Sequence, residues 1–303
     1  MPRIKLIVDE ENTNLRLDVY LANNTPLSRN QIQKLISDSK ILVNNSTSSK
    51  KYETKLNDEI DIKYEENVLT DLLPKDIPLD IVYEDDDVIV VNKPKGLVVH
   101  PAPGNYDNTL VNGLLYHVKD LSDVNGYYRP GIVHRIDKDT SGLLVVCKNN
   151  ESHNKIANQL LDKTCFRKYY AIVDGIISND EGEINAPIGR SKKDRQKMEV
   201  TDLNSKEAVT LFKVLDRLST STLVDCELKT GRTHQIRVHM KFIGHPVIND
   251  AKYGRKVIDE TGQYLHAYYL SFIHPTTNER MEFVTRMPEY MKKYIKENGG
   301  HFE

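Results

Sequence analysis

The most informative stretch of the sequence is Gly131-Ile132-Val133-His134-Arg135-Ile136-Asp137-Lys138-Asp139-Thr140-Ser141-Gly142. Apolar runs flank this polar loop and glycines bound it, and Asp137 stands in it among His134, Arg135 and Lys138. Asp, Ser, Thr and Gly are also the residues that favour turns. The pattern alone therefore leaves two interpretations open, an ordinary turn or a loop that presents a carboxylate.

Short apolar runs surround this loop in the second part of the chain. Alternating or continuous apolar runs predict strands, whereas apolar residues three and four positions apart predict helices. Strands are expected at residues 81–83, 88–91, 143–146, 170–173 and 223–226, and helices at 153–162 and 234–243. This mixture predicts an α+β domain on a largely antiparallel sheet, which we place at residues 76–303.

A second polar stretch, residues 228–239, contains a glycine turn at Gly231 and the expected start of a helix near Thr233. Arg237 would then lie beside the apolar face of that helix. An unpaired charge at the edge of a core is costly, so Arg237 needs a partner, and a carboxylate is the obvious candidate. A structural salt bridge and a functional ion pair both satisfy this requirement.

In a third stretch, residues 167–173, tyrosines precede and alternate with apolar residues. Tyrosines in a strand usually pack a sheet. A tyrosine such as Tyr169 can instead stack on a nucleobase if it faces a cleft.

Residues 13–75 have the pattern of a separate small unit. We expect a first helix over residues 15–21, a second helix that opens at residues 26–28, and strands at 41–45 and 59–62. Residues 28–55 carry six basic against two acidic residues, a net charge of +4, whereas residues 56–87 carry two against twelve, a net charge of −10. The contrast is typical either of solvated faces or of an RNA-binding module followed by an acidic linker.

A third charged segment, residues 190–197, holds five basic residues against one acidic residue. It is either a solvated loop or a clamp for phosphate. With the first unit, it supplies the residues that we expect to contact RNA: Arg29, Lys34, Lys50, Lys51, Arg190, Lys192 and Lys193.

The composition is that of an ordinary globular protein, with 39% hydrophobic and 28% charged residues and a net charge of −2 over 303 residues. The three cysteines are scattered without a C-x-x-C pair, which argues against both a disulfide framework and a zinc site. No apolar run approaches the ~20 residues of a membrane span, and the N-terminus has no apolar signal-peptide core. We therefore expect a cytoplasmic protein without contact to a membrane.

Taken together, these stretches resemble the RluA/RluD family of pseudouridine synthases. Residues 134–142 resemble the family signature, 168–173 its tyrosine motif and 228–239 its arginine motif. Further matches follow in chain order at residues 92–101, 244–250, 265–267 and 274–275. The first unit resembles an S4-type RNA-binding domain. Two departures are Ile136, where the family more often has leucine, and Asn249, where it more often has glycine.

The resemblance implies a pseudouridine synthase catalytic domain on a mixed, largely antiparallel sheet, preceded by a small S4-type α/β RNA-binding domain at residues 13–75. It implies that Asp137 is the nucleophile, that Arg237 pairs with it, and that Tyr169 stacks on the base and assists removal of the C5 proton. Arg135 would fill the space that the flipped uridine leaves. The other expected substrate-binding residues are His134, Thr140, Arg232 and His234.

The resemblance also implies that neither a metal nor an organic cofactor is needed. We expect RNA as partner, above all large-subunit (23S) rRNA or a pre-ribosomal particle, with tRNA as the second candidate, and a monomeric enzyme. Two rival functions are a non-catalytic RNA-binding protein and an unrelated hydrolase that uses a carboxylate. The hydrolase would need a second acid at a defined distance, and Asp139 is poorly suited to that role.

Overall fold

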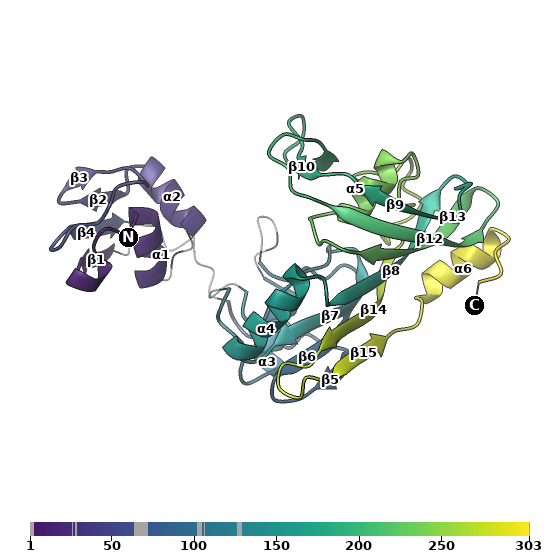
Figure 1. The fold of residues 1–303 in the computed structure, drawn as a ribbon, viewed down its shortest axis with the longest axis horizontal. Helices are drawn as coiled ribbons and strands as arrows, with labels where there is room; N and C mark the ends of the chain where they lie inside the picture. The colour runs from purple at the N-terminus through teal and green to yellow at the C-terminus, as the bar shows by residue number, and fades with distance from the viewer. Residues whose placement is uncertain are drawn as a thin grey trace. The chain divides into compact units, whose positions relative to one another are not determined.

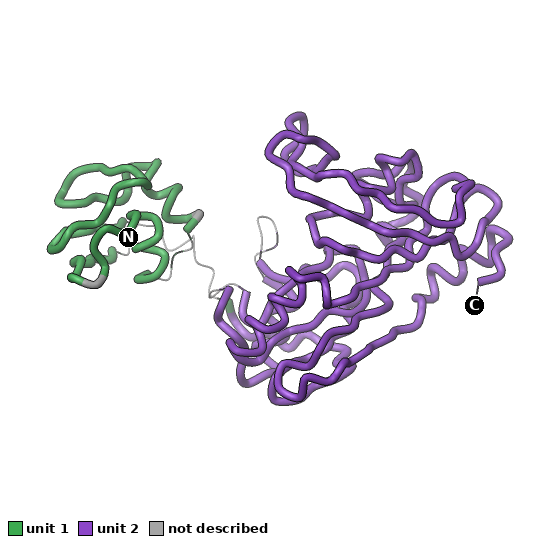
Figure 2. The backbone as a smooth tube through the Cα atoms, viewed as in Figure 1, with its two compact units in different colours: residues 1–72 green, residues 73–303 purple. Residues whose placement is uncertain are grey.

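The computed structural model describes residues 3–25, 27, 29–63, 72–101, 105, 107–125 and 129–302. The chain forms two compact units, residues 1–72 and 73–303, which Figure 2 colours separately. The expected division, at residue 75, differs from this one by three residues, and the expected start at residue 13 leaves out a strand of the first unit.

The first unit is a small antiparallel sheet with two helices (Figure 1). Its elements are β1 (Arg3–Ile7), the 3-10 turn η1 (Glu10–Asn12), α1 (Leu17–Asn24), α2 (Arg29–Ser37), β2 (Ile41–Val43), β3 (Ser46–Thr47) and β4 (Glu59–Lys63). The strand order is β1-β4-β2-β3, and the apolar faces of both helices pack on Ile41, Ile60 and Ile62. Pro26 and Ser28, where we expected the second helix to open, lie outside the described residues.

The described parts of the acidic stretch at residues 56–87 include strands of both sheets and are not a simple linker. Its first part contributes β4 to the sheet of the first unit, and its last part contributes β5 (Ile81–Glu84) to the sheet of the second. Ile60 and Ile62 are buried while Asp61 between them is only partly buried, so alternation made this segment a strand despite its charge.

Within the described residues of the second unit, nine strands form one sheet in the order β5-β6-β7-β14-β8-β13-β12-β9, with β15 paired to β14. Their bounds are β5 Ile81–Glu84, β6 Val88–Lys93, β7 Ser141–Cys147, β8 Phe166–Asp174, β9 Glu181–Asn185, β12 Val209–Arg217, β13 Ser221–Leu228, β14 Leu265–Ile273 and β15 Arg280–Val284. Among these strands only β7 and β14 pair in parallel. The expected α+β domain on a largely antiparallel sheet is confirmed.

Four helices and a hairpin complete the described part of this unit. They are α3 (Leu110–His117), α4 (Asn150–Leu161), α5 (Gln235–Phe242), α6 (Glu289–Glu297) and the hairpin β10 (Ile188–Arg190) with β11 (Met198–Val200). Ile156 of α4 packs on β6, β7 and β14, whereas Met291 and Ile295 of α6 pack on β8 and β13. In Figure 1, α4 lies beside β7, and α5 lies near β9 and β12.

The parallel pairing of β7 with β14 sets the end of the loop at residues 134–140. At the start of β7, Gly142 adopts φ +114°, and a Cβ there would lie 2.1 Å from the carbonyl oxygen of Ala267 on β14. Only glycine fits both the backbone conformation and this close approach. The loop that carries Asp137 therefore has a fixed exit beside the centre of the sheet.

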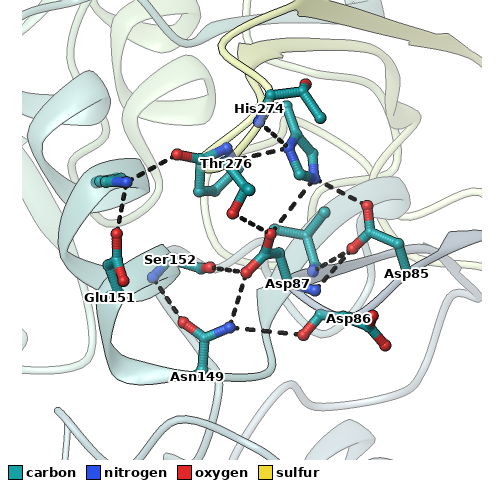
Figure 3. Close-up of polar contacts among 12 residues, drawn as sticks. Asp85, Asp86, Asp87, Asn149, Glu151, Ser152, His274 and Thr276 are labelled. Atoms are coloured by element: carbon teal, nitrogen blue, oxygen red, sulfur yellow. Dashed lines mark hydrogen bonds and ion pairs between the residues drawn. The ribbon is translucent and has the colours of Figure 1, made fainter.

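Away from this loop, a polar cluster joins the β5–β6 turn, the start of α4 and the β14–β15 turn (Figure 3). The Asp87 carboxylate accepts hydrogen bonds from Thr276 at 2.5 Å, Ser152 at 2.7 Å and Asn149 at 2.8 Å. His274 accepts backbone N–H groups at Nδ1 and therefore donates from Nε2 to Asp85 at 2.8 Å. The cluster ties three connections together that are far apart in the sequence.

Candidate active site

Asp137 lies in the loop between Ile132 and the start of strand β7. Ile132 forms an isolated bridge with Val146 of that strand. The backbone N–H of Thr140 donates to the carbonyl of Asp137 at 3.1 Å and closes a turn. The Thr140 hydroxyl is buried and accepts a hydrogen bond from Gln263 at 3.0 Å. The stretch thus forms a turn, and this turn presents the Asp137 carboxylate.

Arg237 on α5 is held between two carboxylates. Its Nη1 donates to Asp137 Oδ2 at 2.7 Å, and its Nε and Nη2 donate to the two oxygens of Asp250 at 2.6 and 2.7 Å. The predicted contact between Arg237 and Asp137 is confirmed. The guanidinium, however, makes its pair of parallel hydrogen bonds with Asp250. Asp250 belongs to one of the matching motifs, but no role was expected for it.

The environment favours the ionised form of Asp137. Burial acts to raise the pKa of its carboxyl, but His234 when protonated, Arg237 and Arg135 together bring that pKa below its ordinary value. Burial lowers the pKa of His234, against the opposing charge of Asp137. The imidazole is therefore neutral at neutral pH, and Arg237 is the adjacent cation that keeps Asp137 ionised.

The Nδ1 atom of His234 has a hydrogen-bond partner. This nitrogen lies 2.8 Å from the hydroxyl oxygen of Tyr253, which already accepts a hydrogen bond from the backbone N–H of Met198 at 2.8 Å. The Tyr253 hydroxyl can then donate its proton to Nδ1, which leaves the ring proton on Nε2. Nε2 is the nitrogen that faces the Asp137 carboxylate, at 3.9 Å.

Tyr169 lies on β8, and only 5% of its surface is exposed. Its neighbours along the strand, Lys168 and Tyr170, lie on the opposite face, because side chains alternate in a strand. Burial raises the pKa of Tyr169 to about 12, although the charge of Arg167 opposes this shift. The phenol is therefore protonated at neutral pH.

His134 and Arg135 differ in their surroundings. His134 accepts the backbone N–H of Val145 at Nε2, and burial followed by the charge of Arg167 lowers its pKa to about 3. Arg135 is exposed, and its Nη1 donates to Nε2 of His100 at 3.1 Å. His134 is therefore a neutral, largely enclosed side chain, whereas Arg135 is a cation at the surface.

A second motif, residues 228–239, is fixed by Gln235. This buried side chain donates to the carbonyl of Val209 and accepts from the backbone N–H of Arg232, both at 3.0 Å. Arg232 itself donates from Nε to the carbonyl of Glu207 at 2.8 Å. The start of α5, and with it Arg237, is thereby anchored to β12.

These elements enclose a cavity of about 520 Å³ in the second unit. It is lined by all eight residues that we expected to act in catalysis or substrate binding there: His134, Arg135, Asp137, Thr140, Tyr169, Arg232, His234 and Arg237. Their roles stay predictions. Asp139 lines a different cavity, so the described side chains that line the Asp137 cavity include no second carboxylate.

The residues expected to contact RNA elsewhere are all exposed. Lys34, Lys50 and Lys51 of the first unit are exposed, as are Arg190, Lys192 and Lys193 around the β10–β11 turn. Arg29 is exposed as well, but it donates to Asp18, whose side chain is fully buried, at 2.9 Å. Arg29 therefore has a structural partner within the first unit.

The described part of the chain contains no cluster of three His, Cys, Asp or Glu side chains suited to hold a metal ion. Cys147, Cys165 and Cys226 are all buried free thiols. Every described helix is too short or too polar to cross a bilayer.

Comparison with known proteins identifies two families. Residues 87–242 match the model of the RNA pseudouridylate synthases, and residues 15–60 match that of the S4 domain. "Uncharacterized RNA pseudouridine synthase YlyB" of Bacillus subtilis is 52% identical over 97% of this chain and 98% of that protein. "Ribosomal large subunit pseudouridine synthase D" of Zymomonas mobilis is 45% identical over 98% of both. The solved structure of human RNA pseudouridylate synthase domain containing 1 is 26% identical and covers 74% of this chain and 96% of that chain, with a TM-score of 0.56.

Proposed function

This chain belongs to the RNA pseudouridylate synthase family and is an RNA pseudouridine synthase, and on that premise we propose two further points. Asp137 is the nucleophile of the reaction, and large-subunit rRNA is the substrate. The observation that carries the first point is the ionised, cavity-facing carboxylate held by Arg237. The proposal that large-subunit rRNA is the substrate rests on relatives whose names specify the large ribosomal subunit and on the S4 domain.

The reaction breaks the C1′–N1 bond of uridine and forms a C1′–C5 bond, while the C5 proton is released and N1 gains a proton. A carboxylate can attack the sugar carbon as uracil leaves, form a covalent sugar–enzyme ester, and leave when C5 attacks in its turn. Asp137 meets the requirement of this step, because it is charged at neutral pH and shielded from bulk water.

Tyr169 supports the proposal as a flat wall of the same cavity. A buried ring can stack on uracil as the base turns. Because its pKa is raised to about 12, the phenol is not a base at neutral pH, and this favours stacking over removal of the C5 proton.

The target uridine must leave its helix to enter a cavity of this size, which costs a few kcal/mol. Arg135 is suited to fill the vacated space, because it is exposed and stands two residues before Asp137. The basic residues around the β10–β11 turn and the lysines of the first unit are suited to bind RNA phosphates.

A carboxylate-dependent hydrolase is a weaker candidate function than a pseudouridine synthase. Such an enzyme needs a second carboxyl group ~5–10 Å away across the scissile bond. Asp250 is bound on both oxygens by Arg237, and Asp139 lines another cavity. tRNA remains the second candidate substrate.

Asp137→Asn tests the nucleophile, since it removes the charge and keeps the shape. We expect no tritium release from C5-labelled uridine in RNA, with wild-type thermal stability. Activity within about tenfold of wild type would refute the assignment. Mapping pseudouridines in cells that lack the protein would identify the target uridine, and loss of a tRNA site would refute the rRNA assignment.

A further inference from the structure

Arg167 is a buried cation inside the catalytic cavity. It stands on β8 two residues before Tyr169 and therefore faces the same side of the sheet. Only 7% of its surface is exposed, and it lines the cavity. Within the described residues its guanidinium makes no hydrogen bond or ion pair, and its Nε is buried without an acceptor.

The other arginines of the cavity differ in this respect. Arg237 is bound by two carboxylates, Arg232 donates to the carbonyl of Glu207, and Arg135 donates to His100. A buried charge without a partner is strongly unfavourable, so proteins almost always pair it. Arg167 is thus a charged group whose partner is missing from the described part of the chain.

The position of this guanidinium is specified by its surroundings. A Cβ at Gly231 would lie 2.7 Å from Nη1 of Arg167, so the guanidinium packs directly against the backbone of residue 231. Gly231 belongs to the loop that leads into α5, and it lines the same cavity. Any side chain at this position would displace the head of Arg167.

We propose that Arg167 binds a phosphate group of the RNA, next to the uridine whose base enters the cavity. This inference rests on the proposed entry of uridine into the cavity. A phosphate carries the full negative charge that compensates a buried guanidinium, and its oxygens match the paired N–H groups of arginine. A uracil carbonyl would accept a hydrogen bond but would leave the positive charge uncompensated.

The test uses a short RNA that carries the mapped target uridine. In two further versions, a neutral methylphosphonate replaces the phosphate on the 5′ or the 3′ side of that uridine. We expect the full-length enzyme to bind one or both neutral versions about tenfold to a hundredfold more weakly. Arg167→Met should bind the natural RNA more weakly by a similar factor and should not distinguish it from the neutral versions.

Two further measurements separate binding from folding. Arg167→Met should unfold at the wild-type temperature or above, because it removes an uncompensated buried charge, and a clear loss of stability would overturn the proposal. Gly231→Ala keeps the charge but displaces the guanidinium, so its affinity for the natural RNA should fall and its sensitivity to the neutral linkage should shrink.

The matched control is Arg280→Met, which removes the same charge near Phe166 on the other face of β8. It should retain the wild-type response to the neutral linkages. Wild-type binding that is indifferent to both linkages, or an Arg167→Met variant that remains sensitive to them, would refute the phosphate contact. These are binding measurements, so they are independent of whether Asp137 is the nucleophile.

Discussion

Arg237 serves two carboxylates, and this arrangement gives the two aspartates different tasks. Asp250 takes both ends of the planar fork, and its Oδ1 also accepts the backbone N–H groups of Lys252 and Tyr253. Asp250 therefore fixes the plane of the guanidinium. Asp137 accepts a hydrogen bond from the remaining Nη1 at Oδ2, and its Oδ1 lies 3.9 Å from Nε2 of His234.

Arg237→Lys and Arg237→Ala test this arrangement. A lysine keeps the charge but cannot reach both carboxylates with a planar fork, so Arg237→Lys should retain some activity and Arg237→Ala nearly none. Because Arg237 lowers the pKa of Asp137, its loss should raise that pKa. Activity needs the ionised carboxylate, so the acid limb of the pH–rate profile should move to higher pH, as single-turnover tritium release would measure.

The control for this series is Arg255→Ala, which removes an arginine that is 64% exposed and paired with Asp174 at 3.2 Å. Its profile should match that of the wild type. An Arg237→Ala variant with an unchanged rate and acid limb would contradict the pairing.

Asn249 shows why a departure from the family pattern can preserve a loop. Its φ is +60°, in the left-handed region that asparagine tolerates better than most residues. Its buried side chain donates to Asp259 at 2.6 Å and to the carbonyl of Gly262 at 3.0 Å, and it accepts the backbone N–H of Ile258 at 2.6 Å. The loop that carries Asp250 is thus tied to residues 258–262.

Asn249→Gly should therefore destabilise the enzyme even though glycine suits the backbone. The loss of these hydrogen bonds should cost about 2 kcal/mol and lower Tm by several degrees. Asn278→Gly is a matched control, because Asn278 has the same φ of +60° but is exposed and makes one weak side-chain contact of 3.4 Å. Equal Tm values for the two variants would show that the Asn249 side chain is dispensable.

Sequence reasoning found the ion pair of Arg237 but not its full geometry, for a physical reason. The cost of an unpaired charge beside an apolar helix face requires a carboxylate partner, whichever fold is adopted. The path of the loop at residues 243–250 decides which carboxylate accepts the two parallel hydrogen bonds from Arg237. Asp250 lies thirteen residues after Arg237, and only the folded loop brings its side chain to the guanidinium.

The strands differ in how far sequence predicts them. Residues 143–146 form a fully buried strand as expected, because a continuous apolar run leaves few alternatives. Residues 223–226 also form a strand as expected, although the partly buried Asp225 interrupts their apolar side chains. No strand was predicted from the sequence at β14, because polar and aromatic residues interrupt its apolar pattern. These residues are His266, Tyr268, Tyr269 and Ser271. It is nevertheless the strand between β7 and β8, where polar side chains find partners such as the hydroxyl of Ser141 for His266.

The cluster of Figure 3 predicts how the connections of the sheet respond to acid. Hydrogen bonding from Thr276, together with Asn149 and Ser152 and against the effect of burial, lowers the pKa of Asp87 to about 2. A carboxyl with a depressed folded-state pKa contributes stability that is present above its unfolded pKa, near 3.9, and is lost as the pH falls towards 2. The turns and α4 should therefore loosen together in acid.

Asp87→Asn should lower Tm at pH 7 and flatten the decline of Tm between about pH 4 and pH 2. Asp86→Asn is the adjacent control, because Asp86 is exposed and, among the described contacts, takes part only through its backbone carbonyl, to Asn149. Thermal unfolding monitored across this pH range would measure both. An Asp87→Asn variant whose acid dependence equals that of the wild type would contradict the assigned role.

We expect the two units to divide the work of binding RNA and of chemistry. The described residues that line the Asp137 cavity all belong to the second unit, whereas the first unit matches the S4 domain and carries exposed lysines on α2 and after β3. The sequence led us to expect this division through the net charge of +4 over residues 28–55. It could not show that Arg29 is engaged by Asp18, because that pairing depends on how α1 packs on α2.

Replacing Lys34, Lys50 and Lys51 together by glutamine tests the division in the full-length chain. Each lysine that contacts a phosphate releases counterions on binding, so three lost contacts should reduce the slope of log affinity against log salt by roughly two to three. Affinity for a folded large-subunit rRNA fragment should fall accordingly, while the turnover rate on bound RNA should stay at the wild-type value. Replacing Lys292, Lys293 and Lys296 of α6 by glutamine removes the same charge from the second unit and should leave the salt slope unchanged. If both triple variants lose the same affinity and slope, the first unit contributes only net charge and is not a specific RNA-binding surface.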